Sequence, residues 1–291
     1  MITQSFGLME ILMINMKGTR WRKVIKEALG QIYRECKVTV SPIPKNKQWI
    51  FIVGCYNSGT TLLSEILGAH PQISALPTEG QYLTDEFFSD HEIGLSRMWT
   101  ARDDLYRLSE GSDGPDVIRL KKEWAMRFDL SKQVLLEKTP ANMARMRWLQ
   151  ENFENSYFLG IVRNGYSVSE GICRKAKPVH RKEGWPIELA ARQWAKSNEI
   201  MLEDAKYIKN FKLVTYEDLT DNPTNTVKSI LDFLRLDAKE IDISQKWAIH
   251  ERNETIQNLN QVSIRSLNKE KIELINTAAM AMLKRFNYEV L

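Results

Sequence analysis

The chain has 291 residues, of which 43% are hydrophobic and 27% are charged, with a formal net charge of +4 and a sequence pI of about 8.8. This composition is typical of a globular chain with enough residues for a sizeable core, and we expect one domain with insertions. The mild positive excess suits anionic ligands. It falls short of the basic stripe of a nucleic-acid-binding protein, so we expect no nucleic-acid partner.

The cysteines indicate a reducing compartment. Cys36, Cys55 and Cys173 are odd in number and widely spaced, which favours neither a disulfide framework nor a zinc site. The sequence contains no run of 18 or more uncharged apolar residues, and its start lacks the pattern of a signal peptide. We therefore expect the cytoplasm as the default location.

Residues 1–45 are expected to form a basic, amphipathic helical segment followed by a linker. Apolar residues recur at helical spacing through a run rich in Lys and Arg at 17–37, and Pro42 and Pro44 then break the pattern. Such a helix most often packs on its own domain, and it can also lie on an anionic membrane or on a partner. Peripheral membrane contact through residues 1–40 therefore stays open, and residues 46–291 are expected to form the main domain.

A phosphate-binding loop is predicted directly after the linker. An apolar strand at 49–53 ends in a turn bracketed by Gly54 and Gly59, and a helix is predicted from Thr60 to about Ala69. Backbone N–H groups of such a loop point at phosphate oxygens. The Lys of the common G-x-x-x-x-G-K-[ST] pattern is replaced by Thr60, which argues against ordinary ATP or GTP hydrolysis. The alternative is a Gly/Ser-rich turn that only caps the helix.

The rest of the chain alternates strands with helices. Further apolar strands are predicted at about 73–76, 134–137, 157–162 and 211–216. Helices are predicted at about 140–153, 166–177, 187–210, 223–233 and 269–286. This alternation predicts an α/β fold with a central, mainly parallel sheet covered on both faces. We interpret residues 85–130 as a helical insertion that could cover a site.

Polar clusters follow the predicted strands where each one ends. They lie at 57–61, at Glu79, and at 137–139, 163–165 and 216–218. Ligands of parallel sheets bind outside the carboxyl ends of the strands, so these clusters indicate one site at one edge. Arg163 would offer a planar, permanently charged fork to a second anion, and Arg174 and Lys175 could add to it. Taken alone, Arg163 is equally compatible with a surface arginine that pairs with a carboxylate.

Metal chemistry is not indicated. Arg163 follows its strand at the point where a P-loop enzyme often places a carboxylate for magnesium. The sequence contains no G-x-S-x-G, G-x-G-x-x-G or H-E-x-x-H motif, and its four histidines are scattered. We therefore expect no metal site, and the same features argue against a kinase.

Taken together, these motifs resemble the sulfotransferases that use 3'-phosphoadenosine-5'-phosphosulfate (PAPS). The resemblance covers roughly residues 49–286 and rests on the loop at 54–63, His70-Pro71 with Glu79, the segments at 137–140 and 161–164, and the segment at 214–223. It is closer to the branch with carbohydrate and protein-tyrosine sulfotransferases than to the branch acting on phenols and steroids. It implies a three-layer α/β/α fold like that of P-loop nucleotide hydrolases, PAPS as co-substrate and adenosine 3',5'-bisphosphate as product.

The resemblance also implies roles for individual residues. Glu79 would take the proton from the acceptor hydroxyl, and Lys138 would stabilise charge on the transferring sulfuryl group and the leaving phosphate. Binding of the nucleotide would fall to Asn57, Ser58, Gly59, Thr60, Thr61, Arg163, Gly171, Lys175 and Tyr216, with Ser263 and Arg265 in a tail loop at 257–265 that closes over it. Transfer would be in line and without a metal, to a hydroxyl of a small molecule or glycan.

Two positions depart from the family pattern. Asn57 stands where the family usually has Lys or Arg, so by position it is the third expected catalytic residue beside Glu79 and Lys138, and it can donate a hydrogen bond but carries no charge. Gly171 stands where the family usually has a Ser that binds the 3'-phosphate. A charged hydrogen bond is roughly twice as strong as a neutral one, so the loss of one cation weakens stabilisation of the transition state. These departures keep a second hypothesis open, a catalytically silent protein that binds PAPS or its bisphosphate product. A nucleotide or sugar kinase is the third.

Overall fold

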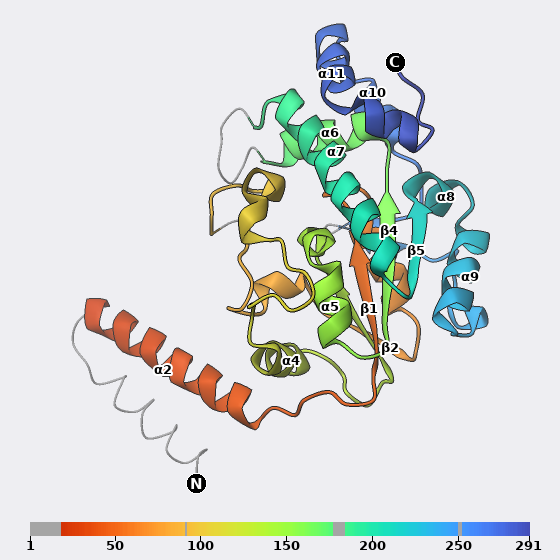
Figure 1. The fold of residues 1–291 in the computed structure, drawn as a ribbon. Helices are drawn as coiled ribbons and strands as arrows, with labels where there is room; N and C mark the ends of the chain where they lie inside the picture. The colour runs from red at the N-terminus through yellow and green to blue at the C-terminus, as the bar shows by residue number, and fades with distance from the viewer. Residues whose placement is uncertain (1–18, 91, 177–183, 250–251) are drawn as a thin grey trace.

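The structure, a computed structural model, describes residues 19–90, 92–176, 184–249 and 252–291. Within these residues one sheet has the strand order β2-β3-β1-β4-β5, and all neighbouring strands are parallel (Figure 1). Its strands are β1 (Gln48–Val53), β2 (Ile73–Ala75), β3 (Val134–Lys138), β4 (Ser156–Val162) and β5 (Phe211–Thr215). The predicted parallel α/β sheet is confirmed.

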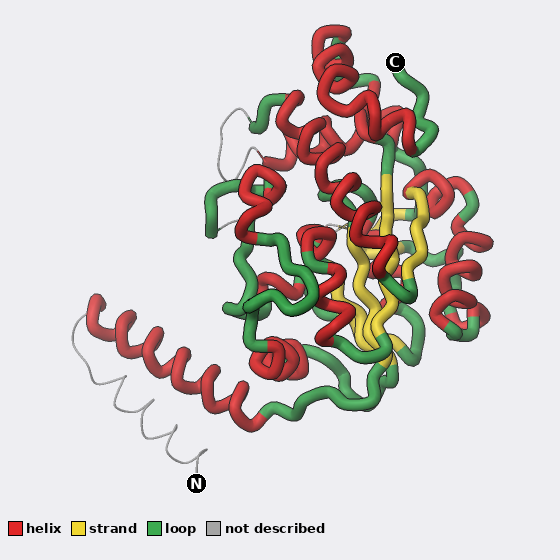
Figure 2. Tube along the Cα trace, in the orientation of Figure 1, coloured by secondary structure: helices red, strands yellow, loops and turns green. Residues whose placement is uncertain are grey.

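Helices lie on both sides of this sheet (Figure 2). The α-helices are α2 (Thr19–Val40), α3 (Thr60–Gly68), α4 (Val117–Ala125), α5 (Met146–Asn152), α6 (Gly165–Ala176), α7 (Ile187–Asp204), α8 (Tyr216–Asp221), α9 (Pro223–Leu234), α10 (Asn260–Ile264) and α11 (Lys269–Arg285). Short 3-10 helices are η1 (Gly80–Tyr82), η2 (Trp99–Leu105), η3 (Pro140–Ala144), η4 (Ala205–Tyr207) and η5 (Ala238–Glu240). A two-stranded hairpin, β6 (Trp247–Ile249) with β7 (Arg252–Glu254), precedes α10.

Strand β1 lies in the middle of the sheet and divides the core into two halves. Ile50 on β1 pairs with Leu136 on β3 and with Tyr157 on β4. Successive side chains of a strand point to opposite faces. Accordingly Phe51 and Val53 pack with α5 and α7, whereas Ile50 and Ile52 pack with α3 and α9. The loop that follows β1 therefore begins at the centre of the carboxyl edge.

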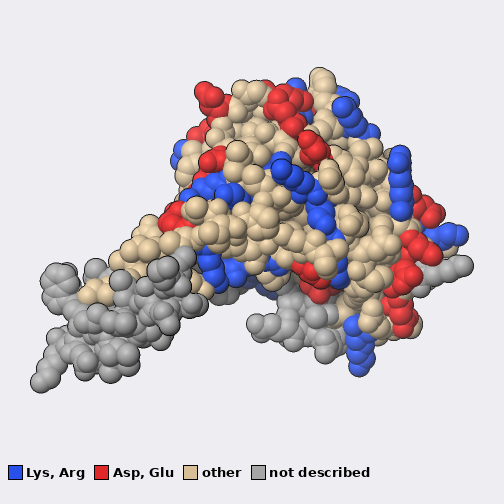
Figure 3. All heavy atoms as spheres, turned by 90° about the horizontal axis from the view of Figure 1, so that it is seen from below, with Lys and Arg blue, Asp and Glu red and all other residues tan. Residues whose placement is uncertain are grey.

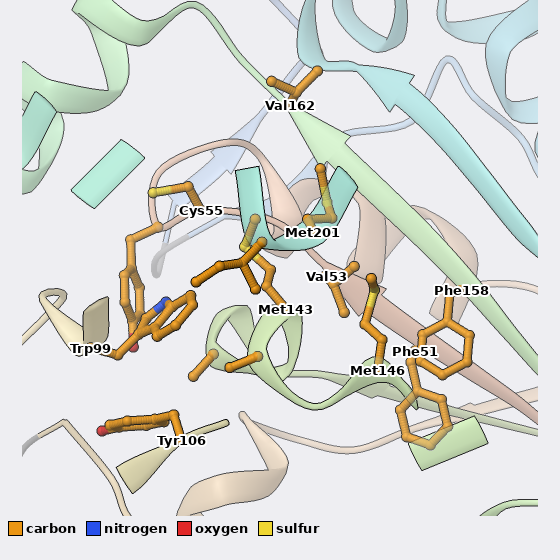
Figure 4. Close-up of a cluster of buried hydrophobic side chains, with 14 of the residues drawn as sticks. Phe51, Val53, Cys55, Trp99, Tyr106, Met143, Met146, Phe158, Val162 and Met201 are labelled. Carbon is orange, nitrogen blue, oxygen red and sulfur yellow. The ribbon is translucent and has the colours of Figure 1, made fainter. Parts of the chain in front are cut away.

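The first of these core halves extends into the loop itself. Figure 4 shows Phe51, Phe158 and Cys55 in one cluster of buried side chains. The rings of Phe51 and Phe158 stack with centroids 5.2 Å apart. Burial raises the pKa of the Cys55 thiol to about 12, so this cysteine is a core residue rather than a nucleophile. The loop is thus anchored in the core on the side where it leaves β1.

Helix α2 extends away from the body and is tied to it by charged groups (Figures 1 and 3). The Arg34 guanidinium pairs with Asp85 at 2.7 Å and with the fully buried Glu123 at 3.1 Å. Glu35 accepts two hydrogen bonds from Arg119 on α4, at 2.7 and 2.9 Å. The predicted helix is confirmed over Thr19–Val40, and residues 1–18 lie outside the described part.

Figure 3 also shows Lys, Arg, Asp and Glu side chains interspersed over the face seen from below in Figure 1. Among the described residues, no helix is long and apolar enough to cross a membrane.

The prediction of a helical insertion at 85–130 is wrong for much of its length. Among the described residues of that segment only η2 and α4 are helical, and residues 86–90 and 92–98 form turns and irregular backbone. Side-chain carboxylates there accept hydrogen bonds from backbone N–H groups that a helix would use for its own bonds. Glu92 accepts from the backbone N–H of Ser89 at 2.8 Å, and Asp90 accepts from that of Arg97 at 2.7 Å.

Two predicted helices are also shorter than expected. The helix predicted at 140–153 is split into η3 and α5 at Arg145, whose φ is −140°. The guanidinium of this buried arginine lies 3.9 Å from the centroid of the Phe87 ring. The helix predicted at 187–210 ends as α7 at Asp204 and continues as the 3-10 helix η4 to Tyr207.

Candidate functional site

The loop after β1 is packed too closely for side chains at its two glycines. A Cβ at Gly54 would lie 2.4 Å from the carbonyl oxygen of Ile161 on β4. Gly59 has φ of +97°, and a Cβ there would lie 2.7 Å from the Tyr216 ring. Asn57 is also left-handed, at φ 65°, a conformation that Asn tolerates better than most residues. The glycine bracket is therefore a geometric requirement.

The loop carries polar groups that have no partner within the described residues. The hydroxyl of Ser58 and both polar atoms of the Asn57 amide are buried without a hydrogen bond. The N–H groups in the first turn of α3 have no acceptor within that helix either, by helix geometry. Buried polar groups are normally paired. A phosphate or sulfate oxygen could accept from the Ser58 hydroxyl, from Nδ2 of Asn57 and from these N–H groups, so the loop fits an anionic ligand.

Arg163, at the end of β4, lies between the loop and the C-terminal tail. Its Nη1 donates to the carbonyl oxygen of Asn57 at 3.0 Å, and its Nε donates to Oδ1 of Asn260 at 2.7 Å. The guanidinium lies 4.1 Å from the centroid of the Tyr216 ring. Burial lowers the pKa of Arg163. Two of the five N–H donors of Arg163 therefore bind the loop and the tail. These two hydrogen bonds also fix the orientation of the guanidinium group.

The tail is ordered by Glu217, a residue that the sequence interpretation gave no role. Glu217 accepts from the backbone N–H of Asn164 and from the hydroxyl of Tyr288, both at 3.0 Å. It also accepts from the Asn260 side chain. The hydroxyl of Tyr216 donates to the carbonyl oxygen of Gln257 at 3.0 Å. These bonds fasten the tail beside Arg163.

The predicted tail loop at 257–265 is in part a helix. Residues Asn260–Ile264 form α10, in which Ser263 is buried, and the exposed Arg265 follows directly. Tyr216 was predicted to end a strand but instead begins α8, with Thr215 as the N-cap that accepts from the N–H of Asp218. Its ring is buried between Gly59 and Arg163.

Glu79 and Lys138 form an ion pair at the same edge of the sheet. Lys138 Nζ lies 3.3 Å from Glu79 Oε1, and the other carboxylate oxygen accepts from the Gln81 side chain at 2.8 Å. Both partners are mostly buried, with 13% of the Lys138 side chain and 16% of the Glu79 side chain exposed. The Glu79 carboxylate lies beside an ammonium group and is still partly exposed to solvent. A carboxylate in this position can accept a proton from a ligand.

A buried carboxylate behind Glu79 fixes the turn that carries it. Glu137 Oε1 accepts from the N–H of Gly80 at 2.9 Å, and Glu137 also accepts from the side chains of Thr139 and Asn142. Burial raises the pKa of Glu137 to about 7. A Cβ at Gly80 would lie 2.7 Å from Glu137 Oε1, so only glycine fits. The sequence placed Glu137 at a strand end, but its role behind Gly80 depends on packing that no motif encodes.

Asn57 and Gly171, the two residues that depart from the family pattern, lie next to each other. A Cβ at Gly171 on α6 would lie 3.1 Å from Asn57 Cγ and 3.3 Å from its Nδ2. Lys175, one turn further along α6, has its pKa lowered to about 8, first by burial and then by the nearby charge of Arg97. Arg174 instead is exposed and pairs with Glu170 at 2.8 Å. Of these two cations on α6, Lys175 is thus the more buried.

Other features lie away from this edge. A hollow of about 550 Å³ is lined by α3, β2 and the start of β6, including Ser64, Glu65, Ser74 and Trp247, and contains none of the predicted site residues. Within the described residues, no three His, Cys, Asp or Glu side chains are grouped so that they could hold a metal ion.

Comparison with known proteins gives a consistent result. The Sulfotransferase family profile matches residues 49–240. The protein-tyrosine sulfotransferase of Drosophila melanogaster is 22% identical over 81% of this chain and 46% of its own length. Protein-tyrosine sulfotransferase A of Caenorhabditis elegans is 23% identical over 65% of this chain and 50% of its own length. The chain thus spans about half the length of these two curated relatives.

Solved structures share the fold. The sulfotransferase domain of the Synechococcus PCC 7002 olefin synthase has a TM-score of 0.54 and 22% identity, with 86% of this chain and 99% of that domain covered. The sulfotransferase domain of the curacin biosynthetic pathway has a TM-score of 0.53 and 20% identity, with 84% and 99% covered. The three-layer α/β fold predicted from the sequence is confirmed by these likenesses and by the parallel sheet.

Proposed function

The chain belongs to the sulfotransferase family, and we propose that it transfers the sulfuryl group of PAPS to a hydroxyl of a small-molecule or glycan acceptor. The observation that carries the proposal is the Glu79–Lys138 pair, which lies at the same sheet edge as a loop with unsatisfied Ser58 and Asn57 groups. A base, a cation and an anion cradle at one edge are the parts that this reaction needs.

The loop would hold the phosphosulfate. Its donors are the N–H groups at the start of α3 together with the hydroxyls of Ser58, Thr60 and Thr61. Arg163 would bind the 3'-phosphate with the donors it does not use on Asn57 and Asn260, because a guanidinium has five N–H groups in a fixed fork. Tyr216 would lie near the adenine, and the tail with Ser263 and Arg265 would cover the nucleotide.

The chemistry balances without a metal ion. The acceptor oxygen would form a bond to sulfur while the bond between sulfur and the bridging phosphate oxygen breaks. Glu79 would take the acceptor proton, and the 5'-phosphate would leave with the electron pair. Lys138 Nζ, 3.3 Å from Glu79, would stabilise the charge that develops on the bridging oxygen. The product would be adenosine 3',5'-bisphosphate.

A second candidate rests on Asn57 and Gly171, the two positions that lack the family's usual ligands. With a neutral amide in place of a cation, the protein could bind PAPS or the bisphosphate product without transferring the sulfuryl group. In that case Glu79 and Lys138 would be remnants of an active ancestor, and binding alone would serve sensing or scaffolding.

The test is a transfer assay with labelled PAPS and a broad panel of hydroxyl acceptors that includes glycans, phenols and tyrosine peptides. The proposal expects a labelled product together with an equal amount of adenosine 3',5'-bisphosphate. Thermal stabilisation by the bisphosphate without transfer to any acceptor would instead support the silent binding protein. Stabilisation by ATP with magnesium, and not by the bisphosphate, would contradict both.

A further inference from the structure

Within the described residues, the Glu79 carboxylate has one hydrogen bond of ordinary length, and its donor is Gln81. Nε2 of Gln81 lies 2.8 Å from Glu79 Oε2, whereas Lys138 Nζ lies 3.3 Å from Oε1, which is longer than the usual N–H···O bond. Glu79 is also the N-cap of η1 but makes no side-chain hydrogen bond to that helix. The orientation of the carboxylate therefore depends chiefly on Gln81.

The Gln81 amide can present only its nitrogen to Glu79. A carboxylate accepts hydrogen bonds and donates none, so the amide oxygen cannot face it. The Gln81 side chain also hydrogen-bonds to the hydroxyl of Tyr82. Because this hydroxyl donates its own hydrogen to Asp90 Oδ1 at 2.8 Å, it accepts from Gln81. Both amide hydrogens are thus engaged, and Tyr82, held by Asp90, fixes the amide in turn.

The oxygen of the same amide has no partner within the described residues. Gln81 is 2% exposed, and its Oε1 is buried without a hydrogen bond. A buried acceptor without a partner destabilises the folded state relative to an apolar side chain of the same shape. The oxygen of Gln81 is therefore unfavourable for stability, while its nitrogen orients Glu79.

The backbone of the turn that carries Glu79 and Gln81 is held by other bonds. The N–H of Gly80 donates to Glu137 Oε1 at 2.9 Å, and its carbonyl oxygen accepts from the Trp124 indole at 3.0 Å. Neither bond involves the Gln81 side chain. Replacing this side chain should therefore leave the backbone of the turn in place and change only what holds the carboxylate.

We propose that Gln81 is a positioning residue of the transfer reaction, whose amide holds Oε2 of Glu79 and so directs the acceptor proton to Oε1, the oxygen that faces Lys138. The O–H bond of the acceptor breaks as an O–H bond to Oε1 forms. A protonated Oε1 attracts the ammonium group of Lys138 less than the carboxylate does, and Lys138 becomes available to the leaving phosphate oxygen. This inference rests on the proposed sulfuryl transfer.

The test compares the steady-state kinetics of the full chain with those of Gln81→Met, using labelled PAPS and the acceptor that the panel above shows to react fastest. Methionine has a similar volume but neither the amide donor nor the unpaired oxygen. A hydrogen bond to a charged group corresponds to about 10- to 100-fold in a rate, so we expect turnover to fall by this factor. The affinity for adenosine 3',5'-bisphosphate should not change, because Gln81 does not belong to the loop. Gln133→Met, at an exposed position, is the control and should have the wild-type rate.

Two further readouts separate a positioning role from a purely structural one. In the Glu79→Gln background, Gln81→Met should have no further effect on turnover, because the carboxylate that it orients is already absent. The thermal unfolding midpoint of Gln81→Met should equal or exceed that of the wild type, because the unpaired oxygen is removed. Additive losses of turnover in the double variant would assign Gln81 to the structure of the site instead and overturn the inference.

Gln81→Asn covers the case in which Gln81→Met does not fold. It keeps an amide but withdraws it from Glu79 by one methylene group, so we expect a similar loss of turnover. Wild-type turnover in either variant would contradict the inference. A wild-type chain that transfers no sulfuryl group to any acceptor of the panel would instead overturn the proposed function on which the inference rests.

Discussion

Lys138 Nζ lies 3.3 Å from Glu79 Oε1, and this pair joins the end of β3 to the turn that follows β2. The two residues are 59 positions apart in the sequence. They meet because β2 and β3 are parallel neighbours and therefore end at the same edge. The arrangement places a proton acceptor, Glu79, beside a cation, Lys138. Replacing each of them has its own expected effect on the rate of sulfuryl transfer.

Replacing Glu79 by Gln should lower turnover by about 10²- to 10⁴-fold, because the amide cannot accept the acceptor proton. The affinity for adenosine 3',5'-bisphosphate should change little, since Glu79 does not belong to the loop. Steady-state kinetics and calorimetry of one preparation measure both. Glu65→Gln, an exposed carboxylate on α3, serves as the control. A wild-type rate in Glu79→Gln would remove Glu79 from the mechanism.

Replacing Lys138 by Ala should cost on the order of 10²-fold or more in turnover, because the loop contributes Asn57 where the family usually has a cation. Loss of the ammonium also leaves Glu79 without its partner. Lys206→Ala, at an exposed position in η4, should leave the rate unchanged. Equal rates for Lys138→Ala and the wild type would assign the stabilising charge to another residue.

Glu137 should make folding stability depend on pH. Its pKa is raised from 4.5 to about 7 in the folded protein, so the folded state holds a proton that the unfolded state has released between these values. Stability therefore falls as pH rises through this window. Urea unfolding at about pH 5 and about pH 8 measures the difference, and Glu137→Gln should reduce it. If Glu137→Gln shows the same difference in unfolding free energy between the two pH values as the wild type, the pH dependence does not come from Glu137. Glu199→Gln, at an exposed position, is the control.

Asn57 and Gly171 should be energetically coupled. Gly171→Ala places a methyl group 3.1 Å from Asn57 Cγ, which forces the amide to move. Asn57→Gly removes that side chain and still suits φ of 65°. In a double-mutant cycle of unfolding free energies, we expect an interaction term of about 0.5–3 kcal/mol, with Gly171→Ala tolerated better beside Asn57→Gly. Additive effects of the two substitutions would show that the contact carries no strain.

Much of the fold could be predicted because apolar runs such as 157–162 and glycine pairs such as Gly54 and Gly59 are local signals. The predicted strand at 134–137 agrees with β3, and the predicted helix from Thr60 agrees with α3. The backbone at 85–90 and 92–98 could not be predicted, since it depends on side chains such as Asp90 that bond to nearby backbone groups instead of permitting a helix.

The candidate site, like the fold, has some residues that local sequence signals predict and others that depend on contacts between distant segments. Residues at strand ends, such as Glu79 and Arg163, could be found because parallel strands bring their carboxyl ends together. The position of Glu137 behind Gly80 could not, because it depends on packing between segments that are distant in the sequence. The contact between Asn57 and Gly171 likewise appears only in three dimensions, and it joins two departures that the sequence presents as separate.

The most direct test of the account is a crystal structure of the chain with adenosine 3',5'-bisphosphate. We predict the 5'-phosphate within hydrogen-bond distance of the N–H groups of Gly59 to Thr61, and the 3'-phosphate at Arg163. Glu79 and Lys138 should then face the open side of the 5'-phosphate, where the sulfuryl group would stand. A nucleotide bound elsewhere, or a 5'-phosphate directed away from the Glu79–Lys138 pair, would contradict the account.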